Sequence, residues 1–283
     1  MSSPQWFITG ASHGFGLLLS LKALKAGHRV VASVRNKTKS ADAVNQIEAA
    51  GGQILELDLN ESKESITKKV QAIGPIDYLV NNAGFFVLGA VEQVTEQEAH
   101  IQLQTNFFGP LFTIQAALPL MRQRRSGTIV NLSSIAAQDP TPASGLYASS
   151  KGALEALSSS LAIELAPFNI SVLIIEPGAF RTNFLAALTP PSAPLPDGYE
   201  GTIAQTATRA YIEKDGKQVG DPQKGVDRIY EAITGESGPA GHLKGKVLRL
   251  VIGRDALERI RKTNGKFMQD LAAGEEATLS TDY

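Results

Sequence analysis

The chain has 283 residues, of which 43% are hydrophobic, and this is enough for one large α/β domain. Its 27 basic residues nearly balance its 28 acidic residues, and the formal charge of -1 excludes the strong basic patch that a nucleic-acid partner would require. Cysteine is absent and the four histidines are scattered, which excludes disulfides, thiolate nucleophiles and metal sites of the usual ligand spacing.

The first residues lack the basic and apolar regions of a secretory signal, and no apolar run reaches the length needed to span a bilayer. We therefore expect a cytoplasmic protein with no membrane span.

Short β-branched or aromatic runs alternate with segments of helical apolar spacing along the chain. The predicted strands cover residues 5–9, 29–34, 53–57, 77–81, 128–132, 171–175 and 247–252. The predicted helices cover residues 14–26, 39–50, 61–72, 95–124, 146–166, 222–235 and 254–272. The alternation predicts one Rossmann-type α/β domain over residues 1–283, with a doubly wound parallel sheet of about seven strands and helices on both faces. Such sheets bind ligands beyond the carboxyl ends of their strands.

The turn after the first predicted strand is rich in glycine and opens a helix. Gly10, Gly14 and Gly16 have the spacing G-x-x-x-G-x-G, and glycines at this place let the N–H groups of a helix N-terminus approach a pyrophosphate. The same segment fits G-x-S-x-G, the nucleophile elbow of α/β-hydrolases, with Ser12 as the nucleophile. That alternative gives Gly16 no role, and it predicts that a serine-directed probe would label Ser12.

The end of the second predicted strand indicates which dinucleotide binds. NAD-binding units usually carry an acid about 20 residues after the glycines, but this chain has Arg35 in that region. A guanidinium binds phosphate through charge-assisted hydrogen bonds, and His13 is a second possible donor within the turn. The sequence therefore predicts NADP(H) as the cofactor; the alternative is that Arg35 is a solvated loop charge.

Two further patterns suggest acid/base chemistry. Tyr147 and Lys151 lie four residues apart in a predicted helix, which places both on one face. A nearby ammonium is expected to lower the pKa of a tyrosine from its usual value near ~10, so that the phenol exchanges protons at neutral pH. Ser134 follows the strand at 128–132 and is placed to donate a hydrogen bond to a developing alkoxide. Each pattern alone is common in proteins with no such chemistry.

Taken together, the motifs resemble the single-domain branch of the short-chain dehydrogenase/reductase family. The matching residues, in chain order, are Thr9, Gly10, Gly14, Gly16, Asp58, Asn81, Asn82, Ala83, Gly84, Asn106, Ser134, Tyr147, Lys151, Pro177, Gly178 and Thr182. The resemblance covers roughly residues 5–182 and continues through the predicted strand near 247–252. It departs from the pattern at His13, where many NADP-using relatives carry arginine or lysine.

The resemblance implies a role for each matching residue. Ser134 would polarise the substrate oxygen, Tyr147 would transfer the proton, Lys151 would bind the nicotinamide ribose and lower the tyrosine pKa, and Asn106 would hold a water that relays protons. Asn82 is expected to brace the sheet. The expected cofactor-binding residues are Gly10, Ser12, His13, Gly14, Phe15, Gly16, Arg35, Asp58, Leu59, Asn81, Ala83, Gly84, Tyr147, Lys151, Pro177, Gly178, Ala179 and Thr182.

The implied reaction is hydride transfer between NADP(H) and a small molecule bound beside the Ser/Tyr pair. A lid is expected over about residues 183–225, and its stretch at 189–198 holds four of the 14 prolines. Apolar side chains predict a lipophilic ketone, aldehyde or secondary alcohol, unless they are ordinary core. They are Phe184, Leu185, Leu188, Tyr199, Tyr211 and Ile212, with Phe85, Phe86 and Phe180 from the other side.

Helices 95–124 and 146–166 resemble those that pair across a two-fold axis in relatives, which implies a homodimer or homotetramer. Residues 274–283 are acidic and polar, either a frayed tail or a tethered arm. Two alternative functions remain open: a biosynthetic enzyme whose net reaction is epimerisation or reductive cyclisation, and a non-catalytic NADPH-binding sensor.

Overall fold

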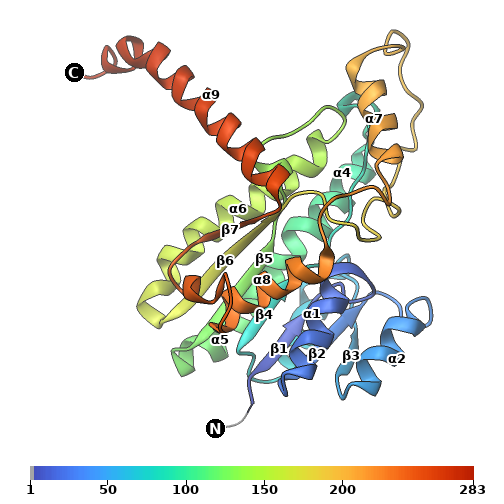
Figure 1. Ribbon diagram of the computed structural model, residues 1–283, viewed down its shortest axis with the longest axis vertical. Coiled ribbons are helices and arrows are strands. Elements are labelled where there is room, and N and C mark those ends of the chain that lie inside the picture. The colour runs from blue at the N-terminus through green and yellow to red at the C-terminus, as the bar shows by residue number, and fades with distance from the viewer. Residues whose placement is uncertain (1–2) are drawn as a thin grey trace.

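Within residues 3–283, which the computed structural model describes, seven parallel strands form one sheet (Figure 1). The strands are β1 (Gln5–Ile8), β2 (Arg29–Val34), β3 (Gln53–Glu56), β4 (Tyr78–Asn81), β5 (Gly127–Leu132), β6 (Ile170–Pro177) and β7 (Arg249–Ile252). Their order is β3-β2-β1-β4-β5-β6-β7, which confirms the predicted Rossmann-type sheet. The strand order reverses between β1 and β4, and a crevice for a ligand is expected outside the carboxyl ends of these two strands.

Helices cover both faces of the sheet. They are α1 (Gly14–Lys25), α2 (Ala41–Ala49), α3 (Lys63–Gln71), α4 (Glu96–Leu103), α5 (Gly109–Arg124), α6 (Gly145–Leu165), α7 (Ile203–Glu213), α8 (Pro222–Thr234) and α9 (Arg254–Leu279). Trp6 and Ile8 of β1 pack into a core shared with α1 and α8, whereas Phe7 packs into a second core with α3, α5 and α6. Successive strand residues point to opposite faces, so β1 is buried on both sides.

Three elements differ from the predicted ones. The predicted helix at 95–124 is interrupted by a π-helical turn (Gln104–Phe108) between α4 and α5. Helix α7 was not predicted; it is not strongly apolar overall and buries none of its residues completely. Helix α9 continues through Gly274 to Leu279, past the predicted end at 272, and no proline interrupts it there.

The proline-rich stretch is bound to the body of the protein. Leu88 N–H donates to the carbonyl oxygen of Thr189 (3.0 Å), and Thr189 N–H donates to that of Phe86 (3.0 Å). Ser192 N–H donates to Glu98 in α4 (2.7 Å). The chain then turns into α7, which Figure 1 shows near α4. Throughout residues 3–283, we find no helix whose length and apolar character would allow it to cross a membrane.

Candidate active site

Three of the predicted catalytic residues meet at the carboxyl end of β5. Tyr147 and Lys151 lie one turn apart on α6, and both are buried. The Lys151 ammonium donates to the carbonyl oxygen of Leu132, the last residue of β5, at 2.7 Å, and lies 5.9 Å from the centre of the Tyr147 ring. Ser134 follows β5 directly and caps a short 3-10 turn, where its hydroxyl accepts from Ala136 N–H (3.1 Å).

Asn106 joins this group from the π-helical turn. Its side chain accepts from Phe85 N–H (3.1 Å) and donates to the Phe85 carbonyl oxygen (3.0 Å) and to the Ser150 hydroxyl (3.0 Å). A Cβ added at Gly84 would lie 3.2 Å from the Asn106 side-chain oxygen and 3.3 Å from the Lys151 nitrogen. The turn therefore brings Asn106 beside the lysine and the loop after β4.

The pKa of the phenol is shifted in the direction opposite to the expected one. Burial raises the pKa of Tyr147 strongly, and a hydrogen bond with Ser134 lowers it only in part. Burial also lowers the pKa of Lys151 to about 8, against the opposing charge of Glu155. Loss of solvation therefore determines the direction of both pKa shifts, and the phenol is protonated at neutral pH.

The glycine turn between β1 and α1 has the shape that a pyrophosphate requires. Gly10 and Gly14 have φ angles of 69° and 59°, which favour glycine. A Cβ added at Gly16 would lie 2.4 Å from the Gly10 carbonyl oxygen, and one added at Gly14 would lie 3.4 Å from the Thr182 Cβ. No side chain caps the start of α1, so its first N–H groups are available to an anion.

The expected phosphate-binding side chains lie on the rim of this crevice. Arg35 and His13 are exposed at the end of β2 and at the start of α1. Within residues 3–283, Arg35 has no hydrogen bond or ion pair of its side chain with another residue. Phe15 packs its ring against Phe180 at 5.1 Å, which leaves only its backbone for a ligand. Ser12 has no described hydrogen bond to a histidine, so the structure gives no support to the hydrolase alternative.

Asn81, the last residue of β4, and Asn82, which follows it, both make side-chain hydrogen bonds within the fold. The Asn81 side chain is buried; it donates to Asn131 (2.9 Å) and accepts from Thr113 (2.6 Å), so this side chain braces the sheet, and a ribose contact of Asn81 stays a prediction for its backbone. The Asn82 side chain donates to the carbonyl oxygens of Thr9 (2.9 Å) and Gly10 (3.0 Å) and holds the glycine turn.

The remaining expected nucleotide contacts lie after β3 and β4. Asp58 accepts from the backbone and side-chain N–H groups of Asn60 (2.9 and 3.0 Å). Leu59 is buried, and its side chain lies close to Gly109. Ala83 is close to Gly10, because a Cβ added at Gly10 would lie 2.6 Å from the Ala83 Cα. Asp58 and Leu59 thus follow β3, Ala83 follows β4 beside the glycine turn, and their contacts with a nucleotide stay predictions.

The loop after β6 is held by a residue that sequence reasoning missed. Asp255, in the first turn of α9, accepts from Ala179 N–H at 2.8 Å. Gly178 N–H donates to the carbonyl oxygen of Ile252 (2.8 Å), and a Cβ added at Gly178 would lie 2.1 Å from the Asp255 carboxylate. The N–H groups of Gly178 and Ala179 are therefore engaged within the fold, and the contacts of Pro177, Gly178, Ala179 and Thr182 with the nicotinamide stay predictions.

A second missed feature is a buried charge cluster behind Lys151. Glu155 lies one turn after Lys151 on α6 and accepts from Ser133 (2.5 Å) and Gln138. Arg249 Nε lies 3.2 Å from a Glu176 oxygen and 3.9 Å from a Glu155 oxygen. Burial raises the pKa of Glu155 and raises that of Glu176 to about 7. Glu155 follows Lys151 by four residues, as Lys151 follows Tyr147, and this spacing could have predicted from the sequence that Glu155 lies on the same face of the helix.

An aromatic cluster covers the phenol. The Phe86 ring stacks on Tyr147 with 4.4 Å between centroids, and Phe184 lies 5.7 Å from Tyr147. Tyr211 of α7 meets Phe86 edge-on at 5.5 Å, and its hydroxyl is 2.5 Å from that of Thr141. Leu188 packs on the same cluster. The structure therefore gathers four of the expected pocket residues around the phenol.

Three other expected pocket residues lie elsewhere. Phe180 packs with Phe15 in the core on the α1 side, because the chain turns inward there. Ile212 is 63% exposed on the outer face of α7. Tyr199 interacts with Glu92, which raises the pKa of the tyrosine.

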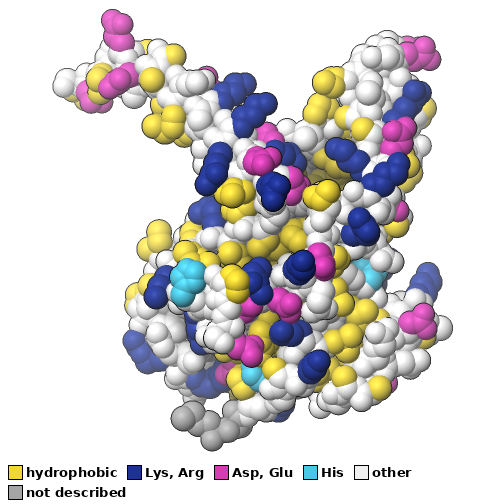
Figure 2. Space-filling model, in the orientation of Figure 1, with side chains coloured by type: hydrophobic (Ala, Val, Ile, Leu, Met, Phe, Trp, Pro, Cys, Tyr) yellow, Lys and Arg dark blue, Asp and Glu magenta, His cyan; other side chains and the backbone are white. Residues whose placement is uncertain are grey.

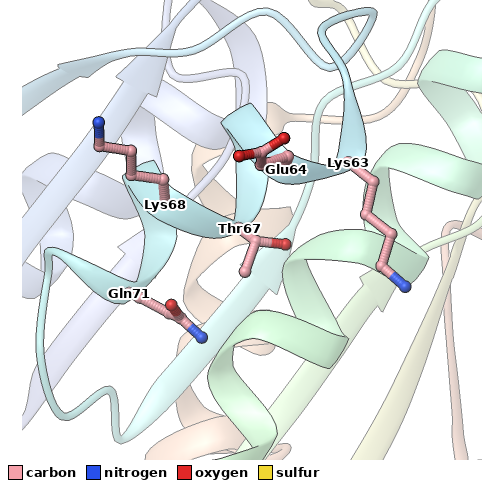
Figure 3. A pocket seen from close by; sticks show the side chains of 5 residues that line it. All are labelled: Lys63, Glu64, Thr67, Lys68 and Gln71. Carbon is pink, nitrogen blue, oxygen red and sulfur yellow. The ribbon is translucent and has the colours of Figure 1, made fainter.

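A surface depression lies apart from the predicted catalytic residues. Figure 3 shows it beside α3, lined by Lys63, Glu64, Thr67, Lys68 and Gln71. It contains none of the catalytic residues and is open to solvent, so it carries no role in the site.

Comparisons with known proteins agree with this geometry. A family model described as short chain dehydrogenase matches residues 5–192. The uncharacterized oxidoreductase YusZ of Bacillus subtilis is 36% identical over 262 residues, which cover 87% of this chain and 88% of that protein. A 3-ketodihydrosphingosine reductase of Bacteroides thetaiotaomicron is 37% identical over 180 residues, 62% of this chain and 64% of that protein. The crystal structure of a short-chain dehydrogenase from Streptomyces avermitilis has a TM-score of 0.85 at 33% identity and covers 100% of both chains. The chain therefore belongs to the short-chain dehydrogenase family of oxidoreductases.

Proposed function

We propose that the protein transfers a hydride between NADP(H) and a lipophilic ketone, aldehyde or secondary alcohol, with Tyr147 as the acid/base. The observation that carries this proposal is the meeting of Ser134, Tyr147 and Lys151 at the end of β5. This group adjoins Gly84 and the crevice lined by the glycine turn. A sensor that only bound the nucleotide would not need a buried phenol, serine and lysine in contact.

The crevice fits a dinucleotide phosphate. The α1 N-terminus is uncapped, and the Gly14 backbone lies close to Thr182 across the crevice. Arg35 offers a guanidinium at the rim for a 2′-phosphate, which is the basis for preferring NADP(H). When bound, the nicotinamide supplies or accepts the hydride. Lys151 would hold the ribose from its position between Gly84 and the Leu132 carbonyl.

The phenol suits proton donation to a carbonyl. With its pKa raised by burial, Tyr147 carries its proton at neutral pH, as an acid must at the moment a hydride reaches the carbonyl carbon. Ser134 would hold the substrate oxygen beside the phenol. For alcohol oxidation, the phenol must first lose its proton, and the Lys151 ammonium is the positive group closest at hand to favour that step.

The aromatic cluster supports a lipophilic substrate. Phe86, Phe184 and Tyr211 form an apolar wall with one polar pair, Ser134 and Tyr147, at its base. The relative from Bacteroides thetaiotaomicron is named as a reductase of a keto lipid precursor, which is the same class of carbonyl. We propose that residues 183–225 form the lid over this substrate.

A panel of lipophilic and of small charged carbonyls, followed by nicotinamide absorbance with NADPH and NADH in parallel, tests the proposal. We expect turnover of lipophilic carbonyls with NADPH, and a loss of at least about 100-fold in Tyr147→Phe with unchanged NADPH affinity. Turnover of charged substrates alone, or full activity in Tyr147→Phe, would refute it. NADPH binding with no turnover of any carbonyl would instead favour the sensor, and a product epimerised or cyclised would favour the biosynthetic alternative.

A further inference from the structure

Helix α9 leaves the body of the protein after its first turns. Its 26 residues give it a length of ~39 Å. Asp255 is bound to Ala179, and Arg259 donates to the Asp139 side chain at 2.6 Å. Beyond Arg259, no hydrogen bond or ion pair links the helix to any other part of residues 3–283. Figure 1 shows this part projecting away from the sheet to the C-terminus.

The projecting part has an apolar face with nothing against it. Phe267, Met268 and Leu271 are 60%, 61% and 51% exposed. Phe267 and Leu271 belong to a stripe with alternating spacings of three and four residues, the seven-residue repeat of paired helices, and Met268 lies beside Phe267 at the edge of this stripe. The stripe runs through Leu257, Ile260, Asn264, Phe267, Leu271, Gly274 and Thr278. Most of the stability of helices in proteins comes from packing of their apolar face, so the exposed stripe indicates a helical partner.

The charges on α9 are divided between its two halves. All of its basic residues lie before Phe267, and from there to the end of the chain the charged residues are acidic. Figure 2 shows basic side chains near the root of the projection and acidic ones near its tip. The basic residues are Arg254, Arg259, Arg261, Lys262 and Lys266, and the acidic ones of the outer half are Asp270, Glu275 and Glu276, followed by Asp282. Two copies side by side in parallel would repel, whereas antiparallel copies would attract.

We propose that α9 of a second copy of this chain covers this face, antiparallel, with a two-fold axis near Met268. In this register, Leu271 packs against Phe267 of the other copy, and Arg261 lies opposite Glu275 of the other copy. In an antiparallel pair of helices, the numbers of two residues that face each other add up to a nearly constant value. This sum is 538 for Leu271 with Phe267 and 536 for Arg261 with Glu275, so one register allows both contacts. The contact is self-complementary, as a two-fold interface must be. It does not depend on the proposed reaction.

Thiol crosslinking tests the register directly, because the chain has no cysteine. With a short bismaleimide, Met268→Cys should form a covalent dimer, and Lys262→Cys on the opposite side of the helix should not. Arg261→Cys and Glu275→Cys should crosslink when mixed but not separately. No crosslink in Met268→Cys, or equal crosslinking in Lys262→Cys, would overturn the proposal.

Solution mass, measured by light scattering after gel filtration, tests whether the face holds the assembly. Leu271→Glu should halve the mass of the wild-type oligomer, while Gln269→Glu, which adds the same charge on the opposite side, should not. Arg261→Glu should weaken the assembly, and Arg261→Glu with Glu275→Arg should restore it. NADPH binding by each variant reports that it is folded. A monomeric wild type at tens of micromolar, or an unchanged mass in Leu271→Glu, would contradict the pairing.

Discussion

The ionisable side chains beside the phenol are subject to two opposing effects, burial and attraction between charges. Tyr147 is 5% exposed, and Lys151 and Glu155 are as deeply buried on the same helix. Burial favours the neutral form of each group, while their mutual attraction favours the charged forms of lysine and glutamate. The pKa of Lys151, lowered to about 8, shows that burial dominates. The site therefore holds a cation at neutral pH at the expense of stability.

Because burial disfavours the charge of Lys151, we predict that a variant without this charge is more stable than the wild type. A buried lysine with a lowered pKa destabilises the fold below that pKa, and the penalty fades as pH rises from about 8 toward the unfolded value of 10.5. Lys151→Met should therefore raise the free energy of unfolding at pH 7, by on the order of 3 kcal/mol before loss of the Leu132 hydrogen bond. Urea unfolding at pH 7 and pH 9.5 should show a smaller gain at the higher pH. A variant less stable than wild type at pH 7 would contradict this account.

Glu155 is expected to influence the reaction through its effect on the pKa of Lys151. Its negative charge raises the pKa of Lys151, so Glu155→Gln should lower that pKa further. We expect the alkaline limb of the pH profile of kcat/KM to move to lower pH, with smaller changes at pH 6. Glu164→Gln, an exposed change on the same helix, is the matched control. An alkaline limb at the wild-type pH would show that Glu155 has only a packing role.

Arg35 decides the proposed cofactor preference. If its guanidinium binds the 2′-phosphate, Arg35→Ala should weaken NADPH binding roughly 10- to 100-fold, as expected for loss of charge-assisted hydrogen bonds. NADH binding should be unchanged because it lacks that phosphate. Titration by nucleotide fluorescence measures both, with Arg29→Ala as a control elsewhere on β2. Equal effects on the two nucleotides would refute the assignment.

At the scale of elements, the root of α9 is part of the site. Asp255 holds Ala179 after β6, and Arg259 holds Asp139 after β5. Asp255→Ala should lose about 1–3 kcal/mol of stability, because the Ala179 N–H loses its acceptor, and should raise the KM for the cofactor. Glu258→Ala, on the exposed side of the same helix, should do neither. Thermal unfolding and steady-state kinetics of the two variants make the comparison.

At the scale of the whole molecule, the sequence predicted the layers and the order of motifs well. Alternating strands and helices imply parallel pairing, and parallel pairing places every strand end on one edge. The parts that could not be predicted depend on tertiary contacts. The π-helical turn at Asn106 is fixed by Phe85, and the inward direction of Asn81 is fixed by Asn131. The anchoring of α9 joins residues 76 positions apart.

The aromatic cover over Tyr147 has a kinetic consequence. Phe86 and Phe184 lie against the phenol, and we predict that these rings separate and close again around the substrate in each catalytic cycle. Separating packed rings is a collective motion, slower than side-chain rotation and of the kind that often limits turnover. Deuterium at the transferred position of the nicotinamide should then leave kcat nearly unaltered, while added viscogen should slow it.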